Sequence, residues 1–203
     1  GDDGADHGKW RAPELMPGRG SGEFYSTSSG ASDVAAQYAA ALAQSYINFG
    51  NSEDLDYAIA LYDFAAKYRT ITYDQMTYSD KSAEDDIAWA ANWLYLATKD
   101  DSYLADAAKD TSSTNDWTND YYYGGVWLGA ALINAEITGN WTAPVNYIKG
   151  VVNANQGKFY VMNSWGSARH NTLMQTCALV ATKHKEESGA DFADWCQSQM
   201  NMI

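Results

Sequence analysis

Residues 84–98 read EDDIAWAANWLYLAT, and this stretch indicates the fold class. Its apolar residues recur at steps of three and four, which places Ile87, Ala90, Trp93, Leu94 and Ala97 on one broad face. That period is typical of an amphipathic α-helix. The acidic residues at its start also suit the positive end of a helix dipole. The sequence therefore predicts a helix over residues 83–98.

The same pattern recurs along the chain, separated by polar or glycine-containing connections. Further helices are predicted over residues 34–49, 53–68, 102–109, 120–138, 143–154, 167–184 and 191–202. The alternation of polar and apolar residues that marks a strand is scarce, and its best example is residues 158–162. The sequence predicts an all-α protein, and its alanine-rich helix faces favour a toroid or solenoid of helical hairpins in two closely packed layers.

Composition excludes several classes of protein. The 203 residues include 13 Lys and Arg against 26 Asp and Glu, a net charge of −13 that argues against a nucleic-acid binder. Hydrophobic residues make up 46% of the chain, too many for a disordered one. No stretch approaches the roughly 18 consecutive apolar residues of a membrane span. A single domain over residues 1–203 is expected, with residues 1–30 as a loop rich in glycine and proline.

Cys177 and Cys196 are the only cysteines. Two cysteines are too few for a disulfide scaffold, and their separation lacks the paired spacing of a zinc site. Whether they pair with each other is left open by the sequence.

Four segments, taken in order, resemble the catalytic domain of the family 9 glycoside hydrolases, the cellulases built on an (α/α)6 barrel. They are GDDGADHGKWRAPELM at residues 1–16, the helix at 84–98, NSWGSAR at 163–169, and the final helix at 192–200. The resemblance implies that residues 1–30 form a loop of the substrate cleft. It also implies that residues 31–203 are helical hairpins from the middle of such a barrel.

The activity implied by the resemblance is hydrolysis of internal β-1,4-glucosidic bonds with inversion. The family's catalytic base lies in an Asp-Ala-Gly-Asp motif that precedes the segment matched by Asp6 and His7. Its general acid is a glutamate that lies beyond a Gly-Asp-Asn-Pro loop. Neither motif occurs in these residues, so we expect no catalytic residue in this chain. The resemblance implies an internal fragment of a secreted or extracellular enzyme. Its partners would be cellulose or β-glucan oligosaccharides and the remaining segments of the parent enzyme.

The resemblance also assigns a set of substrate-binding residues. Aromatic planes stack on the C–H faces of sugar rings, and nearby polar groups bond the hydroxyls. The positions matching that role are His7, Trp10, Tyr78, Trp117, Trp165, Arg169 and His170. The family usually has tyrosine where His170 stands. The tryptophans on predicted helices are expected in the core, namely Trp89, Trp93, Trp127 and Trp195.

Asp85 and Asp86 at the start of the 83–98 helix have two interpretations. Acidic residues there stabilise the helix dipole by roughly 0.3–1 kcal/mol each without any ligand. Some family members instead bind calcium at this helix start, which implies a Ca²⁺ site from Asp85, Asp86, the carbonyl of Ser82, and Asp120. Hard oxygen ligands of this kind suit Ca²⁺. No organic cofactor is implied.

Two other classes of protein remain as alternatives. A carbohydrate-binding pseudoenzyme would keep Trp10, Trp165 and Arg169 and lack the carboxylates. An unrelated all-α interaction protein would show no affinity for glucan oligosaccharides.

Overall fold

The computed structural model describes residues 8, 10, 12–15, 30–71, 80, 82–109, 121, 124–162 and 165–203. These residues form helices and no β-strand, which confirms the predicted all-α class. The elements are the 3-10 helices η1 (Pro13–Leu15) and η2 (Asp101–Tyr103), and the α-helices α2 (Ser32–Phe49), α3 (Ser52–Tyr68), α4 (Glu84–Thr98), α5 (Leu104–Ala107), α6 (Trp127–Thr138), α7 (Thr142–Ala154), α8 (Ser167–Lys183), α9 (Lys185–Ser188) and α10 (Ala193–Met200).

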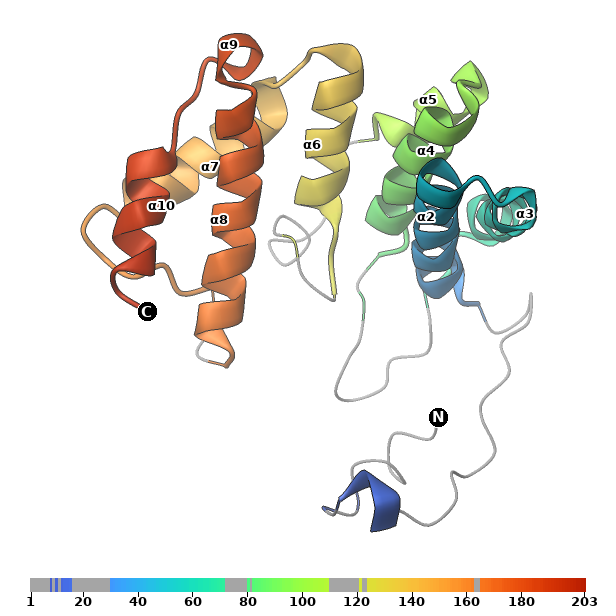
Figure 1. Cartoon of the computed structure of the whole chain (residues 1–203), viewed down its shortest axis with the longest axis horizontal. Helices are drawn as coiled ribbons and strands as arrows, with labels where there is room; N and C mark the ends of the chain where they lie inside the picture. The colour runs from blue at the N-terminus through green and yellow to red at the C-terminus, as the bar shows by residue number, and fades with distance from the viewer. Residues whose placement is uncertain are drawn as a thin grey trace.

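Helices α2, α4, α6 and α8 form an inner row in which each packs on the next (Figure 1). The outer helices pack against this row: α3 on α2 and α4, α5 on α4, α7 on α6 and α8, and α10 on α8. The four inner helices begin at the same end of the molecule in Figure 1. The chain is thus a curved double layer of helical hairpins, as the sequence predicted.

Two apolar clusters hold the double layer together, one for each half of the row. The cluster around α2, α3 and α4 is mostly alanine, with Ile87 and Leu94 of α4 as its largest fully buried members. The cluster around α6, α7, α8 and α10 contains Leu128 and Ile148 together with Trp127 and Trp195. Small side chains allow close helix packing, which explains the alanine-rich faces of the sequence.

Connections at the two ends of the inner row differ in length. At one end the helices are joined by tight turns such as Gly50, whose φ of 74° ends α2 in a left-handed conformation. At the other end the connections before α4, α6 and α8 span residues 69–83, 108–126 and 155–166. The start of α2 is fixed there by a reciprocal pair, in which the Ser32 N–H donates to the Thr70 carbonyl and the Thr70 N–H donates to the Ser32 hydroxyl.

Most predicted helix bounds agree with the structure within two residues, but two predicted helices are wrong in part. The predicted helix at 120–138 begins only at Trp127. The preceding Val126 N–H donates to the Asp85 carboxylate at 2.7 Å, so a contact from distant sequence sets where α6 begins. The predicted helix at 102–109 is the 3-10 turn η2 followed by the short α5.

The strand considered for residues 158–162 is also absent. The backbone groups of Lys158 and Tyr160 bond to the side-chain amides of Gln199 on α10 and Asn171 on α8 and not to a neighbouring strand.

The prediction that four tryptophans lie in the core is correct for two of them. Trp127 and Trp195 are buried. Trp89 and Trp93 are half-buried and line a hollow on the inner row. The buried thiols Cys177 and Cys196 are not joined by a disulfide, and burial raises the pKa of Cys196 to about 11.

Among the described residues, no helix has both the length and the apolar character that crossing a bilayer requires.

Candidate functional site

Four of the residues assigned to substrate binding by sequence lie in the described part of the chain. Trp165, Arg169 and His170 lie at the start of α8, and Trp10 precedes α2 in sequence. His7, Tyr78 and Trp117 lie outside the described residues. The structure thus brings Trp165, Arg169 and His170 together where α8 begins.

Two of these residues present aromatic surface to solvent. The side chain of Trp165 is 85% exposed, and that of Trp10 is fully exposed. An exposed indole has no core role to explain it, and a flat apolar ring with a polar edge suits stacking on a sugar.

Gly166 and Arg169 form a compact polar group directly after Trp165. Gly166 has a φ of 67°, and a Cβ added there would lie 3.3 Å from Nη2 of Arg169. The guanidinium therefore folds back over Gly166, the residue that follows Trp165 in sequence. Because this position is left-handed and close to Arg169, it favours glycine.

His170 is only 3% exposed, and its Nε2 lies 3.0 Å from Nη2 of Arg169. A guanidinium only donates hydrogen bonds, so Nε2 must accept and the ring proton belongs on Nδ1. The imidazole of His170 thus accepts from Arg169 and orients the guanidinium. Direct contact between His170 and substrate stays a prediction.

A second group of chemically active side chains lies at the start of α4. Carboxylate oxygens of Asp80, Asp85 and Asp86 all lie within 4.8 Å of one another, and all three residues are buried. Gln37 of α2 donates to Asp86 Oδ1 at 2.9 Å, and the Val126 N–H donates to Asp85 Oδ2. The other oxygens, Asp85 Oδ1 and Asp86 Oδ2, have no hydrogen-bond partner among the described residues.

Burial makes these carboxylates hard to ionise without a cation. It raises the pKa of Asp85 to about 6, although the backbone N–H of Val126 lowers it. Burial raises the pKa of Asp86 well above its usual value, and the charges of Asp85 and Asp80 raise it further. No Lys or Arg of the described chain forms an ion pair with Asp85 or Asp86.

The convergence of buried carboxylates, two of whose oxygens have no hydrogen-bond partner among the described residues, fits a hard cation such as Ca²⁺. Asp85 and Asp86 are where the sequence predicted ligands, and half-buried Ser82 lies between them and Asp80, with its N–H donating to Asp80 Oδ1 at 3.3 Å. Asp120, the fourth predicted ligand, lies outside the described residues. Asp80 was missed, and an aspartate shortly before the Asp-Asp pair was the only signal the sequence offered.

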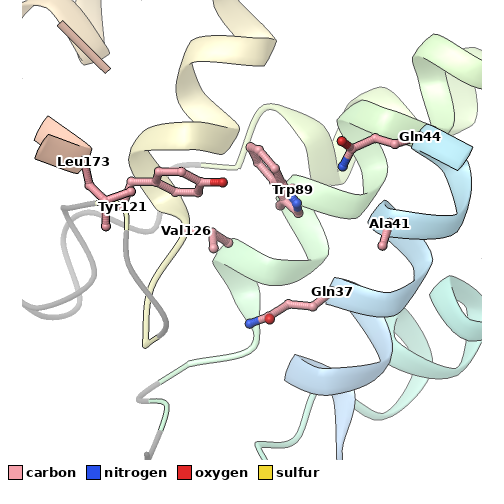
Figure 2. A pocket seen from close by; sticks show the side chains of 7 residues that line it. All are labelled: Gln37, Ala41, Gln44, Trp89, Tyr121, Val126 and Leu173. Atoms are coloured by element: carbon pink, nitrogen blue, oxygen red, sulfur yellow. The ribbon is translucent and has the colours of Figure 1, made fainter. Parts of the chain in front are cut away.

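A hollow of about 430 Å³ opens between α2, α4 and α8 (Figure 2). Gln37, Gln44 and Trp89 line one side, and Tyr121 and Leu173 lie on the other. An adjoining hollow of about 240 Å³ is lined by Trp89, Trp93, Tyr121 and apolar residues of α6 and α8. The inner row therefore presents a concave and largely apolar face, which the sequence did not predict.

Comparison with known proteins gives a consistent result along the whole chain. The family model for glycosyl hydrolase family 9 matches residues 1–203. Endoglucanase B of Cellulomonas fimi is 32% identical over 89% of this chain and 20% of its own length. Endoglucanase 4 of a Bacillus species is 28% identical over 98% of this chain and 34% of its own length.

Solved structures agree with the sequence relatives. The catalytic domain of CelT from Clostridium thermocellum superposes with a TM-score of 0.82 at 30% identity, over 97% of this chain and 48% of that chain. The cellulase Cel9M of C. cellulolyticum, solved in complex with cellobiose, gives a TM-score of 0.83 at 29% identity, over 100% of this chain and 51% of that one. The chain thus spans about half of these solved structures, and 34% and 20% of the two relatives above.

Proposed function

Because this chain belongs to glycosyl hydrolase family 9 and folds as part of an (α/α)6 barrel, we propose that it forms one wall of a β-1,4-glucan-binding cleft. The complete enzyme would hydrolyse internal glucosidic bonds of cellulose or related β-glucans. Family membership removes the alternative of an unrelated all-α interaction protein.

The observation that carries this proposal is the exposed Trp165 beside Arg169 at the start of α8. The indole offers a stacking plane for a glucosyl ring, and the guanidinium offers a fork of donors for its hydroxyls. His170 fixes the orientation of that fork. Trp10, which precedes the first inner helix in sequence, is also exposed. Cel9M, whose structure superposes on the whole chain, was solved with cellobiose bound.

We assign no catalytic residue to this chain. Inverting hydrolysis requires a protonated acid at the leaving oxygen and a carboxylate that activates water, roughly 6.5–9.5 Å apart. Asp80, Asp85 and Asp86 do not suit these roles, since they are buried and within 4.8 Å of one another. The acid and the base are proposed to come from residues outside 1–203.

The remaining helices of the barrel are a further proposed partner. Tyr38 on α2 and Leu179 on α8 expose their side chains on the first and last helices of the row. These two end helices are where further helices of the barrel would pack. A secreted or extracellular location for the whole enzyme follows from its insoluble substrate.

The acidic cluster at α4 is proposed to bind a structural Ca²⁺ ion. Asp85, Asp86 and Asp80 would supply carboxylate oxygens, with the carbonyl of Ser82 and Asp120 as further candidates. Gln37 links Asp86 to α2, and Asp85 bonds the residue before α6. An ion there would tie three inner helices together at the cleft end.

Titration with cello-oligosaccharides tests the proposed function. Cellotetraose should bind with heat release and quench tryptophan fluorescence, and affinity should rise from cellobiose to cellotetraose as more rings are stacked. Maltotetraose is the matched control, because it has the same glucose units in α-linkage. Equal binding of both sugars, or binding of neither, would contradict a β-glucan cleft.

A further inference from the structure

Two buried amide side chains replace a strand partner for residues 158–160. Gln199 of α10 and Asn171 of α8 are both fully buried. The Tyr160 N–H donates to Gln199 Oε1 at 2.8 Å, and Gln199 Nε2 donates to the Lys158 carbonyl at 2.8 Å. Asn171 Nδ2 donates to the Tyr160 carbonyl at 3.1 Å. The polar backbone of this segment is thus satisfied by side chains.

The amides also bond to one another, which fixes their orientations. Asn171 Nδ2 donates to Gln199 Oε1 at 2.8 Å, and Gln175 Nε2 donates to Asn171 Oδ1 at 2.6 Å. A buried amide that loses a hydrogen-bond partner destabilises the fold, so such a network favours one arrangement. The network therefore defines one path for residues 158–160.

This path leads directly to the proposed sugar-binding face. Tyr160 is buried in the cluster of α6, α7, α8 and α10, and Trp165 follows it within the same connection. Asn171 belongs to the first turns of α8, the helix that carries Arg169. Gln199 thus bonds both to Tyr160, which precedes Trp165 in sequence, and to Asn171 on α8, the helix that begins just after Trp165.

We infer that Gln199 is a positioning residue for the face formed by Trp165 and Arg169. It touches no substrate, and it acts by holding residues 158–160 so that the indole and the guanidinium keep their relative geometry. Small displacements of binding groups weaken binding strongly. This inference rests on the proposed function, since it assumes that the face binds β-glucan.

The test replaces Gln199 with methionine, which keeps the length of the side chain and removes all its hydrogen bonds. In Gln199→Met, the Kd for cellotetraose should rise roughly tenfold, the equivalent of one lost buried hydrogen-bonding group. Hydrogen exchange of the Tyr160 amide should become faster, while α2 and α3 stay as protected as before. Gln197→Met is the matched control, because Gln197 lies on the same helix and is exposed, and its side chain bonds only to Asn201 among the residues that the structure describes.

A double-mutant cycle separates positioning from a general loss of stability. Combined with Trp165→Ala, the Gln199→Met change should weaken binding no further, because the group it positions is gone. A fully additive effect, or an unchanged Kd despite faster exchange at Tyr160, would overturn the inference.

Two further results complete the test. If Gln199→Met does not fold, Gln199→Asn serves instead. It keeps an amide but is one methylene shorter, so it cannot bond to both Tyr160 and Lys158. The Kd should then shift in the same direction by a smaller factor, and an unchanged Kd would overturn the inference. Failure of the unaltered protein to bind cellotetraose would instead count against the proposed function.

Discussion

Trp165→Ala should weaken cellotetraose binding by roughly tenfold or more, the scale of losing an aromatic anchor from a binding site. The side chain is 85% exposed, so its removal leaves no cavity and the melting temperature should change little. Isothermal titration at a temperature well below the melting point measures the effect. The physical reason is the loss of the plane on which a glucosyl ring stacks.

Two control variants make this result specific. Trp165→Phe retains a smaller plane and should keep part of the affinity. Phe49→Ala removes another exposed aromatic side chain, 82% exposed at the far end of α2, and should leave the Kd unchanged. If Trp165→Ala binds as tightly as the unaltered protein, the face at the start of α8 is not the sugar-binding wall.

Calcium should raise the melting temperature of the protein by several degrees. A ligand at 100 times its Kd stabilises the folded state by about 2.7 kcal/mol, and each kcal/mol corresponds to roughly 2–4 °C for a chain of this size. Thermal unfolding is followed by circular dichroism after removal of metal with EDTA and again with millimolar CaCl₂. The ion would neutralise carboxylates that are buried within 4.8 Å of one another.

Asp86→Asn is the sharpest variant for this prediction, because its amide oxygen still accepts the bond from Gln37. It should abolish the calcium-dependent shift. Without calcium it should be as stable as the unaltered protein or more so, because a buried acid has been removed from the cluster. Asp56→Asn makes the same chemical change at an exposed site on α3 and should keep the full shift. A shift that survives in Asp86→Asn would place the calcium effect elsewhere.

Sequence predicted those parts of the fold that depend on local periodicity. The helix at 83–98 was correct to one residue, because its apolar spacing and acidic start are properties of neighbouring residues. The start of α6 was wrong because the Val126 N–H bonds to Asp85, a residue far away in sequence. Trp89 and Trp93 have the spacing of core residues, yet they border hollows because the inner row is concave.

The candidate site divides in the same way. The sequence motifs identified Trp165, Arg169, Asp85 and Asp86 as candidates. The structure adds that Arg169 lies against Gly166, the residue after Trp165, and against His170. Asp80 and Gln199 gave no comparable signal, because each gains its role from partners that the fold brings together. Positions of this kind become visible only when the tertiary structure is known.

Residues 1–203 are thus proposed to supply a sugar-binding wall and not the acid and base of hydrolysis. The most direct test is to measure the release of reducing sugar from soluble carboxymethylcellulose by residues 1–203 expressed alone, with cellotetraose binding measured on the same sample. We expect binding without hydrolysis. Hydrolysis by these residues alone would contradict this proposal and would make their own carboxylates the catalytic candidates.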